Sequence, residues 1–330
     1  MVSSNYPPPG NEVAGFAHAF AATLEPGKRD KLQQPYSAAA AATWSNFPQG
    51  YLGKRHKRIG LPTRKLDKSQ WRALDDLLAA ALGKGREQGF DQLSQHLAAD
   101  DYLHAIGAGD HYGRGNFFVA YLGKPSNAGA WQLQFGGHHL AVSNSYHHGK
   151  LVGATPSFRG IEPFPSFEFD GRRHTPMTRK CTAIAELLHS LTKPQLEQAR
   201  LRGSWPDVVL GPGDDHRFPT TSKGITGADL SAAQRKLLIA AMAEWVRDTS
   251  DRDAAEILAD YAGAIEETHL AFAGKPKITR PGDYARIDGP RVWIELSMHE
   301  GIVLTTPHPH SVWRDRLTDY GGRDFPHQSF

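Results

Sequence analysis

The sequence predicts an α+β fold in which a mostly antiparallel sheet and its surrounding helices form one large domain, residues 1–330. Helical spacing of apolar residues covers about residues 10–105 and 178–273, whereas strand-forming residues dominate about residues 115–156 and 284–312. Helices and strands therefore follow one another in blocks. This order is typical of α+β proteins rather than of a doubly wound parallel sheet, in which strands and helices alternate singly.

The helical blocks contain apolar residues three and four positions apart, as an amphipathic helix requires. Trp71, Leu74, Leu77 and Leu78 show the spacing clearly, and Ser231 is a suitable N-cap for a later helix. Pro35 is an obstacle inside one of the expected segments. We expect helices over residues 11–24, 28–43, 66–83, 90–105, 178–202, 231–246 and 253–272.

The strand blocks are rich in β-branched and aromatic residues and contain turn-forming sequences. A turn is expected at 125–129 and a hairpin tip at 147–150. We expect strands over residues 116–122, 131–135, 138–143, 151–155, 284–287, 291–298 and 302–306. We place the C-terminal strands in the same sheet as the central ones, which brings two histidine motifs together.

Composition narrows the classes of function. The chain is 39% apolar and 22% charged, with a net charge of +3 and only one dense basic run, at 54–58. Nucleic-acid binding usually needs a sustained basic face, and no apolar run is long enough to cross a membrane. We therefore expect neither partner, while the oligomeric state stays open. Without a visible signal peptide we expect a cytoplasmic protein, or an exported one if its export segment has been removed.

Cys181 is the only cysteine, which excludes an intramolecular disulfide and a thiolate-rich metal site. Its helical sequence context indicates a buried structural residue. Histidine, in contrast, occurs seventeen times, which hints at metal or proton chemistry.

Two histidine motifs are the main candidates for a site. In a strand, residues two apart share a face, so His308 and His310 point the same way, as in a two-histidine chelate. Pro309 between them cannot donate a ladder hydrogen bond, which favours an edge, a bulge or a loop. His138 and His139 would diverge in a regular strand, so that one reaches a metal, unless the preceding glycines turn both inward.

Three further residues could assist these histidines. Glu295 could complete a metal shell or act as a general base, or it could be a solvated residue on an exposed sheet face. Arg314 could clamp a substrate carboxylate, and Asp315 could orient a ligand histidine. Both could instead form a structural ion pair that holds the C-terminus. Nitrogen and oxygen donors without cysteine suit copper, iron or zinc.

These motifs resemble the uncharacterised family catalogued as domain of unknown function 3500. The resemblance rests on Tyr-Leu-Gly-Lys-Pro-Ser at 121–126, Phe-Gly-Gly-His-His-Leu at 135–140, Ala-Thr-Pro-Ser-Phe-Arg-Gly at 154–160 followed by Glu-Pro at 162–163, Gly-Pro-Arg-Val-Trp-Ile-Glu at 289–295, and His-Ser-Val-Trp-Arg-Asp at 310–315 followed by Thr-Asp-Tyr-Gly at 318–321. It covers about residues 10–322. It implies that the Gly-His-His and His-x-His elements form one site, with Thr155 and Phe158 lining its pocket. Family members often carry Glu where this chain has Gly136, and many carry export signals.

The sequence thus predicts a metal-dependent enzyme, an oxidoreductase that uses copper or iron at a mononuclear, histidine-rich site to act on a small molecule. A zinc hydrolase with the same ligands is the first alternative. A non-catalytic protein that binds a metal or small ligand is the second, and a metal-free site for acid–base chemistry or core hydrogen bonding is the third.

Overall fold

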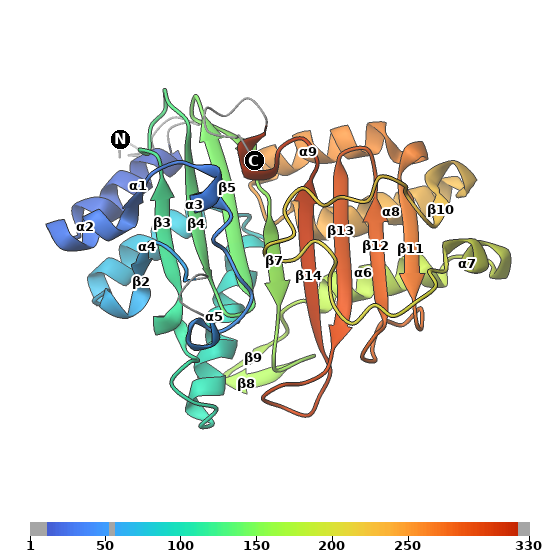
Figure 1. Ribbon diagram of the computed structural model, residues 1–330, viewed down its shortest axis with the longest axis horizontal. Helices are drawn as coiled ribbons and strands as arrows, with labels where there is room; N and C mark the ends of the chain where they lie inside the picture. Colours follow the sequence, from blue (N-terminus) through green and yellow to red (C-terminus); the bar gives the residue numbers. More distant parts are fainter. Residues whose placement is uncertain (1–11, 53–56, 323–330) are drawn as a thin grey trace, which may run out of the picture.

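A mostly antiparallel sheet of twelve strands forms the centre of this computed structural model, which describes residues 12–52 and 57–322. Helices pack against this sheet, and the predicted α+β class is confirmed (Figure 1). The start of the first expected helix at residue 11 and most of the basic run at 54–58 lie outside the described residues. Within the described residues, none of the helices has the length and apolar character that a membrane crossing requires.

The helices are α1 (Glu12–Ala22), α2 (Pro26–Leu32), α3 (Ala38–Ala41), α4 (Lys68–Ala81), α5 (Gly89–Ala105), α6 (Thr178–His189), α7 (Lys193–Ala199), α8 (Ala232–Val246) and α9 (Asp251–Gly263). The strands are β1 (Gln33–Gln34), β2 (Leu61–Pro62), β3 (Phe118–Leu122), β4 (Trp131–Gly137), β5 (Leu140–His147), β6 (Lys150–Gly153), β7 (Ser157–Gly160), β8 (Phe167–Phe169), β9 (Arg172–His174), β10 (Ile225–Thr226), β11 (His269–Ala273), β12 (Tyr284–Asp288), β13 (Val292–His299) and β14 (His308–Asp315).

The sheet joins the central meander to the C-terminal strands through β7 and β14. Its order is β1-β3-β4-β5-β7-β14-β13-β12-β11-β10, with β2 beside β3 and β6 beside β5. His310 pairs with Gly160 and Trp313 pairs with Ser157 at this junction. The expectation that both strand blocks share one sheet is therefore confirmed, and the two histidine motifs meet at the junction.

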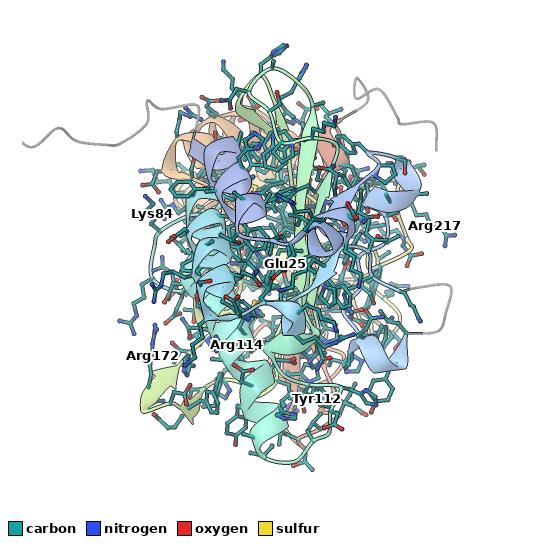
Figure 2. The ribbon with its side chains drawn as sticks, turned by 90° about the vertical axis from the view of Figure 1, so that its left-hand side faces the viewer. Glu25, Lys84, Tyr112, Arg114, Arg172 and Arg217 are labelled. Atoms are coloured by element: carbon teal, nitrogen blue, oxygen red, sulfur yellow. The ribbon has the colours of Figure 1, made fainter. Side chains whose placement is uncertain are left out.

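The two faces of the sheet are covered differently. Helices α4, α5, α6, α8 and α9 lie behind the sheet in Figure 1, whereas irregular segments cross the front of β14, β13 and β12. Figure 2, viewed from the side, shows Lys84 and Arg172 on the helix-covered side and Arg217 on the loop-covered side.

Apolar side chains fill the space between the sheet and the helices. Ile294, Leu296 and Trp313 pack with Leu238 and Trp245 of α8 in one cluster. A second cluster joins α1, α4 and α5 to β3, β4 and β5. Burial of such side chains is the dominant favourable contribution to folding. This rigid layer fixes the strands that carry the histidines.

The structure differs from the sequence predictions at several segment boundaries. Residues 28–43 do not form one helix, because α2 ends before Pro35, which cannot donate the hydrogen bond that a helix interior needs. The expected helix over 178–202 is two helices, and the second begins at a capping box formed by Thr192 and Gln195. Cys181, expected to be buried, is partly buried and packs against the core from α6, and burial of its thiol raises its pKa to about 12.

For two further segments, the predicted type of secondary structure was wrong. The expected helix over 253–272 ends at Gly263, and its last residues form β11, because a short apolar run fits a buried strand as well as a helix. Residues 302–306 form no strand. There, the backbone N–H groups of Ile302, Val303 and Leu304 donate to the carboxylate of Glu162 instead of to a neighbouring strand.

Candidate metal centre

Strand β14 places His308 and His310 on the loop-covered face of the sheet. They pair with His299 and Ser297 of β13. Pro309 points its ring away from them, and its carbonyl accepts a hydrogen bond from the Ile161 N–H at 3.2 Å. β14 as a whole lies inside the sheet, but at Pro309 it pairs only with Met298 of β13, because β7 ends at Gly160. The expected edge is therefore present locally, on the side to which Pro309 has no N–H to donate.

His138 and His139 form the two-residue turn between β4 and β5. His139 adopts a left-handed backbone (φ 57°). Its N–H donates to the Asn46 carbonyl at 2.9 Å, and its carbonyl accepts from the Gly160 N–H at 2.8 Å. Because the loop before β2 and the end of β7 both hold this turn, the His139 ring is fixed beside β14.

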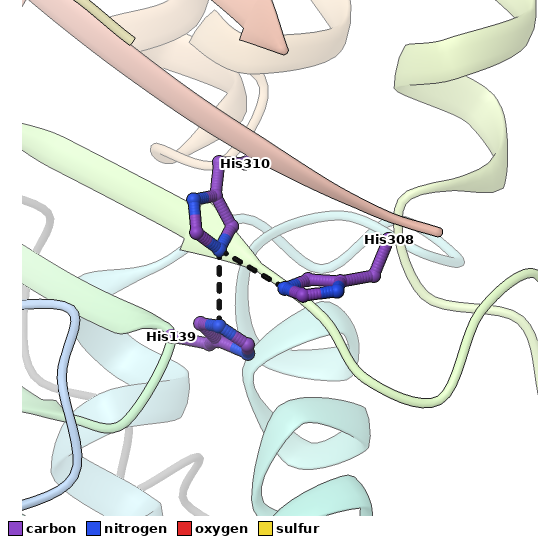
Figure 3. Close-up of side chains that lie close together, drawn as sticks. All are labelled: His139, His308 and His310. Atoms are coloured by element: carbon purple, nitrogen blue, oxygen red, sulfur yellow. Dashed lines mark hydrogen bonds between the residues drawn. The ribbon is translucent and has the colours of Figure 1, made fainter. Parts of the chain in front are cut away.

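The Nε2 atoms of His139, His308 and His310 converge on one point (Figure 3). The His310 Nε2 lies 3.2 Å from that of His308 and 3.1 Å from that of His139. One ligand atom from each ring lies within 4.8 Å of the others, and all three residues are buried. We call these residues the histidine tripod.

This spacing fits metal coordination better than mutual hydrogen bonding. Two nitrogens each about 2.0–2.1 Å from one ion lie about 3.3–3.4 Å apart at the tetrahedral angle and about 3.1–3.2 Å apart at an angle of about 100°. Nδ1 of His310 donates to the Asp207 carboxylate, so in the neutral ring Nε2 carries only a lone pair. A single lone pair is poorly suited to two ring N–H donors at once. The donor set therefore fits a metal ion.

Burial keeps two of the rings neutral. It lowers the pKa of His308 to about 2, and the neighbouring imidazoles add to the shift. Burial also lowers the pKa of His139 well below its ordinary value, with His138 and His310 contributing. Because a metal ligand must be deprotonated, both rings are ready to coordinate at neutral pH.

Two carboxylates that the sequence analysis missed orient the histidines. Asp207 accepts from Nδ1 of His310 at 2.9 Å, and Asp100 of α5 accepts from Nδ1 of His138 at 2.7 Å. Burial alone would raise the pKa of Asp207, but the hydrogen bond and charge interaction with His310 lower it below its ordinary value. Both acids come from segments distant in sequence, and no local motif identifies them.

Gly160 allows the close approach of two tripod rings. A Cβ atom at this position would lie 2.9 Å from Cδ2 of His310 and 3.1 Å from Cδ2 of His139. Such distances are too short for an unshifted Cβ contact. The absence of a side chain at Gly160 is therefore a condition for the tripod geometry.

His299 is a fourth histidine at the site. Its ring stacks on His310 with a centroid distance of 4.8 Å and an interplanar angle of 20°. His299 pairs directly with His308 across β13 and β14. Strand alternation placed His299 on the same face as Glu295, so its position in the strand could have identified it.

A cavity of about 360 Å³ opens beside the tripod. His138, His139, His299 and His310 contribute to its wall, together with Glu162 and Asp207. The apolar part of the wall consists of Phe47, Pro48, Tyr51, Leu52, Tyr112 and Ile302. Figure 2 shows Tyr112 at the lower end of the molecule. The tripod thus faces a space of the size that small-molecule sites have.

The structure does not include His138 or Glu295 in the tripod. The His138 ring stacks on His139 at 3.8 Å but points Nδ1 at Asp100. Glu295 is fully buried, and its carboxylate accepts from Val209 N–H (2.6 Å), Leu210 N–H (2.9 Å), Tyr284 Oη (2.5 Å) and Trp293 Nε1 (2.7 Å). It is thus not a solvated surface group.

Arg314 and Asp315 lie away from the cavity. Arg314 is fully buried and forms ion pairs with Asp215 and Asp319. Asp315 points to the opposite face of β14, where it accepts from Tyr261 Oη at 3.0 Å and pairs with Arg291 at 2.9 Å. These contacts match the structural ion-pair alternative rather than contact with a substrate or a ligand histidine.

Thr155 and Phe158 are buried near the junction of β7 and β14 but are not part of the cavity wall at the tripod. Thr155 instead lines a separate, smaller cavity of about 150 Å³ with Tyr261 and Arg291. The Phe158 ring lies behind the tripod, with its centroid 5.6 Å from that of His310. Phe158 therefore supports a ligand ring rather than facing a substrate.

The comparison with known proteins gives one family. The family model described as "Protein of unknown function (DUF3500)" matches residues 8–322, nearly the whole chain. No curated protein and no solved structure matches the chain.

Proposed function

We propose that the chain, which belongs to the DUF3500 family of proteins of unknown function, is a metal-dependent oxidoreductase. His139, His308 and His310 would bind a single copper or iron ion. The observation that carries the proposal is the convergence of three Nε2 atoms at 3.1–3.2 Å beside a cavity. Such an ion, once bound, would supply one-electron chemistry and an open position for oxygen or substrate.

The choice of metal follows from the donors. Imidazole nitrogens suit copper, iron and zinc, whereas magnesium and calcium prefer oxygen ligands. The carboxylate of Asp207 behind His310 fixes the ring tautomer and makes Nε2 a stronger donor. The three neutral ligands leave the charge of the ion uncompensated, which favours binding of an electron-rich substrate or oxygen species.

The cavity favours an enzyme over a closed storage site. His139 and His310 are tripod members and also part of the cavity wall, so the space for further ligands adjoins the cavity. A non-catalytic metal-binding protein would instead surround its ion with protein ligands. The open arrangement is what catalytic metal sites share.

The carboxylates near the tripod argue for redox chemistry over hydrolysis. Glu295, the general base that the sequence suggested, already accepts four hydrogen bonds. Glu162 accepts from three backbone N–H groups, and Asp207 from His310. Among the described residues of the cavity wall, both carboxylates thus already accept from protein donors, which weakens each as a base for a metal-bound water.

A zinc hydrolase is the second candidate. Three histidines with one open position are a known catalytic zinc set, and the Asp207–His310 pair matches the carboxylate–histidine arrangement found behind zinc ligands. Zinc itself lowers the pKa of a bound water to about 7, so this route needs no strong carboxylate base. The identity of the metal separates the two candidates.

The first test is elemental analysis of the purified protein and of a His308→Ala/His310→Ala variant. A matched control is His147→Ala/His148→Ala, which removes a stacked histidine pair from the turn at the other end of β5. We expect stoichiometric copper or iron in the wild type and the control, its loss in the tripod variant, and oxygen consumption that follows the metal.

The possible results separate the proposals. Stoichiometric zinc in the purified protein would reject the oxidoreductase and favour the zinc hydrolase. Metal without any turnover across oxidase and hydrolase assays would favour a binding protein. Absence of metal from the wild type, with none taken up from added copper, iron or zinc, would reject the metal site.

A further inference from the structure

We infer that the tripod cavity takes an uncharged molecule with a largely apolar body. This inference rests on the proposed function in one respect: it assumes that the cavity beside the tripod is where substrate binds. It goes further by naming the chemical class that the walls select. Three features of the described residues support it: the exposed apolar side chains at the cavity opening, the hydrogen bonds that the charged groups of the wall already form, and the volume of the cavity.

The mouth of the cavity carries an unusual group of exposed apolar side chains. Only five large apolar side chains are exposed among the described residues: Phe47, Tyr51, Ile106, Ile302 and Leu317. Three of them, Phe47 (52% exposed), Tyr51 (65%) and Ile302 (66%), line this cavity. Clustered exposed apolar surface marks binding sites, whereas scattered residues carry no such meaning.

The charged groups of the wall disfavour an organic anion. Glu162 and Asp207 are its acidic residues, and the described wall contains no lysine or arginine. Arg58, buried nearby, directs one nitrogen at the carbonyls of Ser45, Phe47 and Gly137. An anion would therefore face two carboxylates and lose its hydration without a matching cation from these residues.

The same groups also disfavour an organic cation. Three backbone N–H groups donate to Glu162, and the Val208 N–H (2.7 Å) and His310 both donate to Oδ1 of Asp207. These protein donors already partly balance both carboxylates, which makes each a weaker counter-ion for a bound cation. Burial raises the pKa of Tyr112 to about 12, so its phenol is neutral as well. An uncharged ligand avoids both penalties.

The volume sets the size. About 360 Å³ lies at the lower end of the range for small-molecule sites, which is about 300–1,000 Å³. A fused bicyclic aromatic compound with one short polar substituent fits that space. The aromatic walls from Phe47, Tyr51 and Tyr112 would stack on such a ring system.

The test uses three probes of one shape and different charge: 2-naphthalenemethanol, 2-naphthoate and 2-naphthylmethylammonium. Binding to the full chain is measured by titration calorimetry, both as purified and after removal of metal by a chelator. The chelated sample matters because a bound metal ion would itself attract the carboxylate. In that sample we expect the anion and the cation to bind about tenfold or more weakly than the alcohol, because each must lose its hydration.

Variants locate the binding. Phe47→Ser and Ile302→Ser at the mouth should each weaken binding of the alcohol several-fold by removing apolar contact. Leu317→Ser, which removes an equally exposed apolar side chain (52%) outside the cavity wall, should not. Circular dichroism of each variant checks that the fold is kept.

Several results would overturn the inference: equal or tighter binding of naphthoate or of the ammonium probe in the chelated sample, no binding of the alcohol up to millimolar concentration, or equal effects of the mouth and control substitutions. Metal content measured on the same preparations keeps the two proposals apart. Preferred binding of the alcohol to a protein that takes up no metal would reject the metal centre and keep the ligand class.

Discussion

Asp207 accepts a hydrogen bond from Nδ1 of His310 at 2.9 Å, on the side of the ring opposite the nitrogen that faces His139 and His308. Asp207 belongs to the irregular segment between α7 and β10, while His310 lies within the sheet on β14. Figure 1 shows that this segment crosses the front of β14. The covering loop therefore sets the orientation of a ring that the sheet carries. Side chains from two separate parts of the chain must be in place before the tripod is complete.

Replacing Asp207 with alanine should weaken metal binding. The substitution removes the acceptor that fixes the tautomer of His310, and loss of such a partner typically costs about 10–100-fold in affinity. Competition with a chromophoric chelator measures this change. Asp214→Ala, which removes an exposed acid of the same loop that pairs with Arg217, is the control. Equal affinity of the two variants would mean that Asp207 does not orient the ligand.

Replacing Gly160 with alanine should disturb the tripod without unfolding the chain. The new Cβ would lie 2.9 Å from His310 and 3.1 Å from His139, so at least one ring must shift by a few tenths of an ångström. Metal–ligand distances are reproducible within about 0.2 Å, so this shift should reduce metal occupancy. Metal content per folded protein and the circular dichroism spectrum measure the two effects.

Gly263→Ala is the matched control for this substitution. Gly263 ends α9, and a Cβ there meets no atom within 4 Å. Full metal occupancy in both variants would show that the rings adapt to the added methyl group, and that the glycine is not required.

The meeting of the two histidine motifs could be predicted because it depends on sheet alternation and on the block order of strands. Residues two apart in a strand share a face whatever surrounds them, so His308 and His310 were placed together correctly. The pairing of β7 with β14 is a long-range contact. The block order predicted only that the central and C-terminal strands share one sheet, and β7 (Ser157–Gly160) was not among the expected strands.

The hydrogen-bond partners of the histidines could not be predicted. Asp100 lies on a helix and Asp207 on a loop, and neither belongs to a local motif. The sequence offered Asp315 as the nearest acid to the His-x-His motif. Strand alternation, however, turns Asp315 to the opposite face from His308 and His310, toward Tyr261. Proximity in sequence was a poor guide there, and alternation alone would have corrected it.

Glu295→Gln should destabilise the protein while leaving metal binding intact. Four donors converge on this fully buried carboxylate, and an amide would turn its NH₂ group toward at least one of them. The cost should be about 2–3 kcal/mol in the free energy of unfolding, as for a buried group left without its partner. Urea unfolding and metal analysis of the folded fraction measure the two effects. Loss of metal with an unchanged free energy of unfolding would contradict this prediction and would mean that Glu295 is a metal ligand.

The pH dependence of stability should reveal the buried histidines, and His96 on α5 isolates the effect. Burial lowers the pKa of His96 to about 3 from 6.5, with the positive charge of Arg159 adding to the shift. Below about pH 6.5 the unfolded chain binds a proton that the folded protein does not take up until about pH 3. Stability from this residue is therefore fully present above pH 6.5 and falls as the pH drops toward 3, by about 1.4 kcal/mol per pH unit.

His139 and His308 shift in the same direction, so the whole metal-free protein should lose stability steeply in acid. His96→Asn keeps a donor toward the Gln92 carbonyl, which Nδ1 of His96 contacts at 2.8 Å, but removes the titrating ring. Its free energy of unfolding in urea should therefore fall with a slope smaller by about one proton between pH 6 and 4. His189→Asn, at an exposed position on α6, should keep the wild-type slope. Identical slopes in all three proteins would mean that His96 is charged, or solvated, in the folded state.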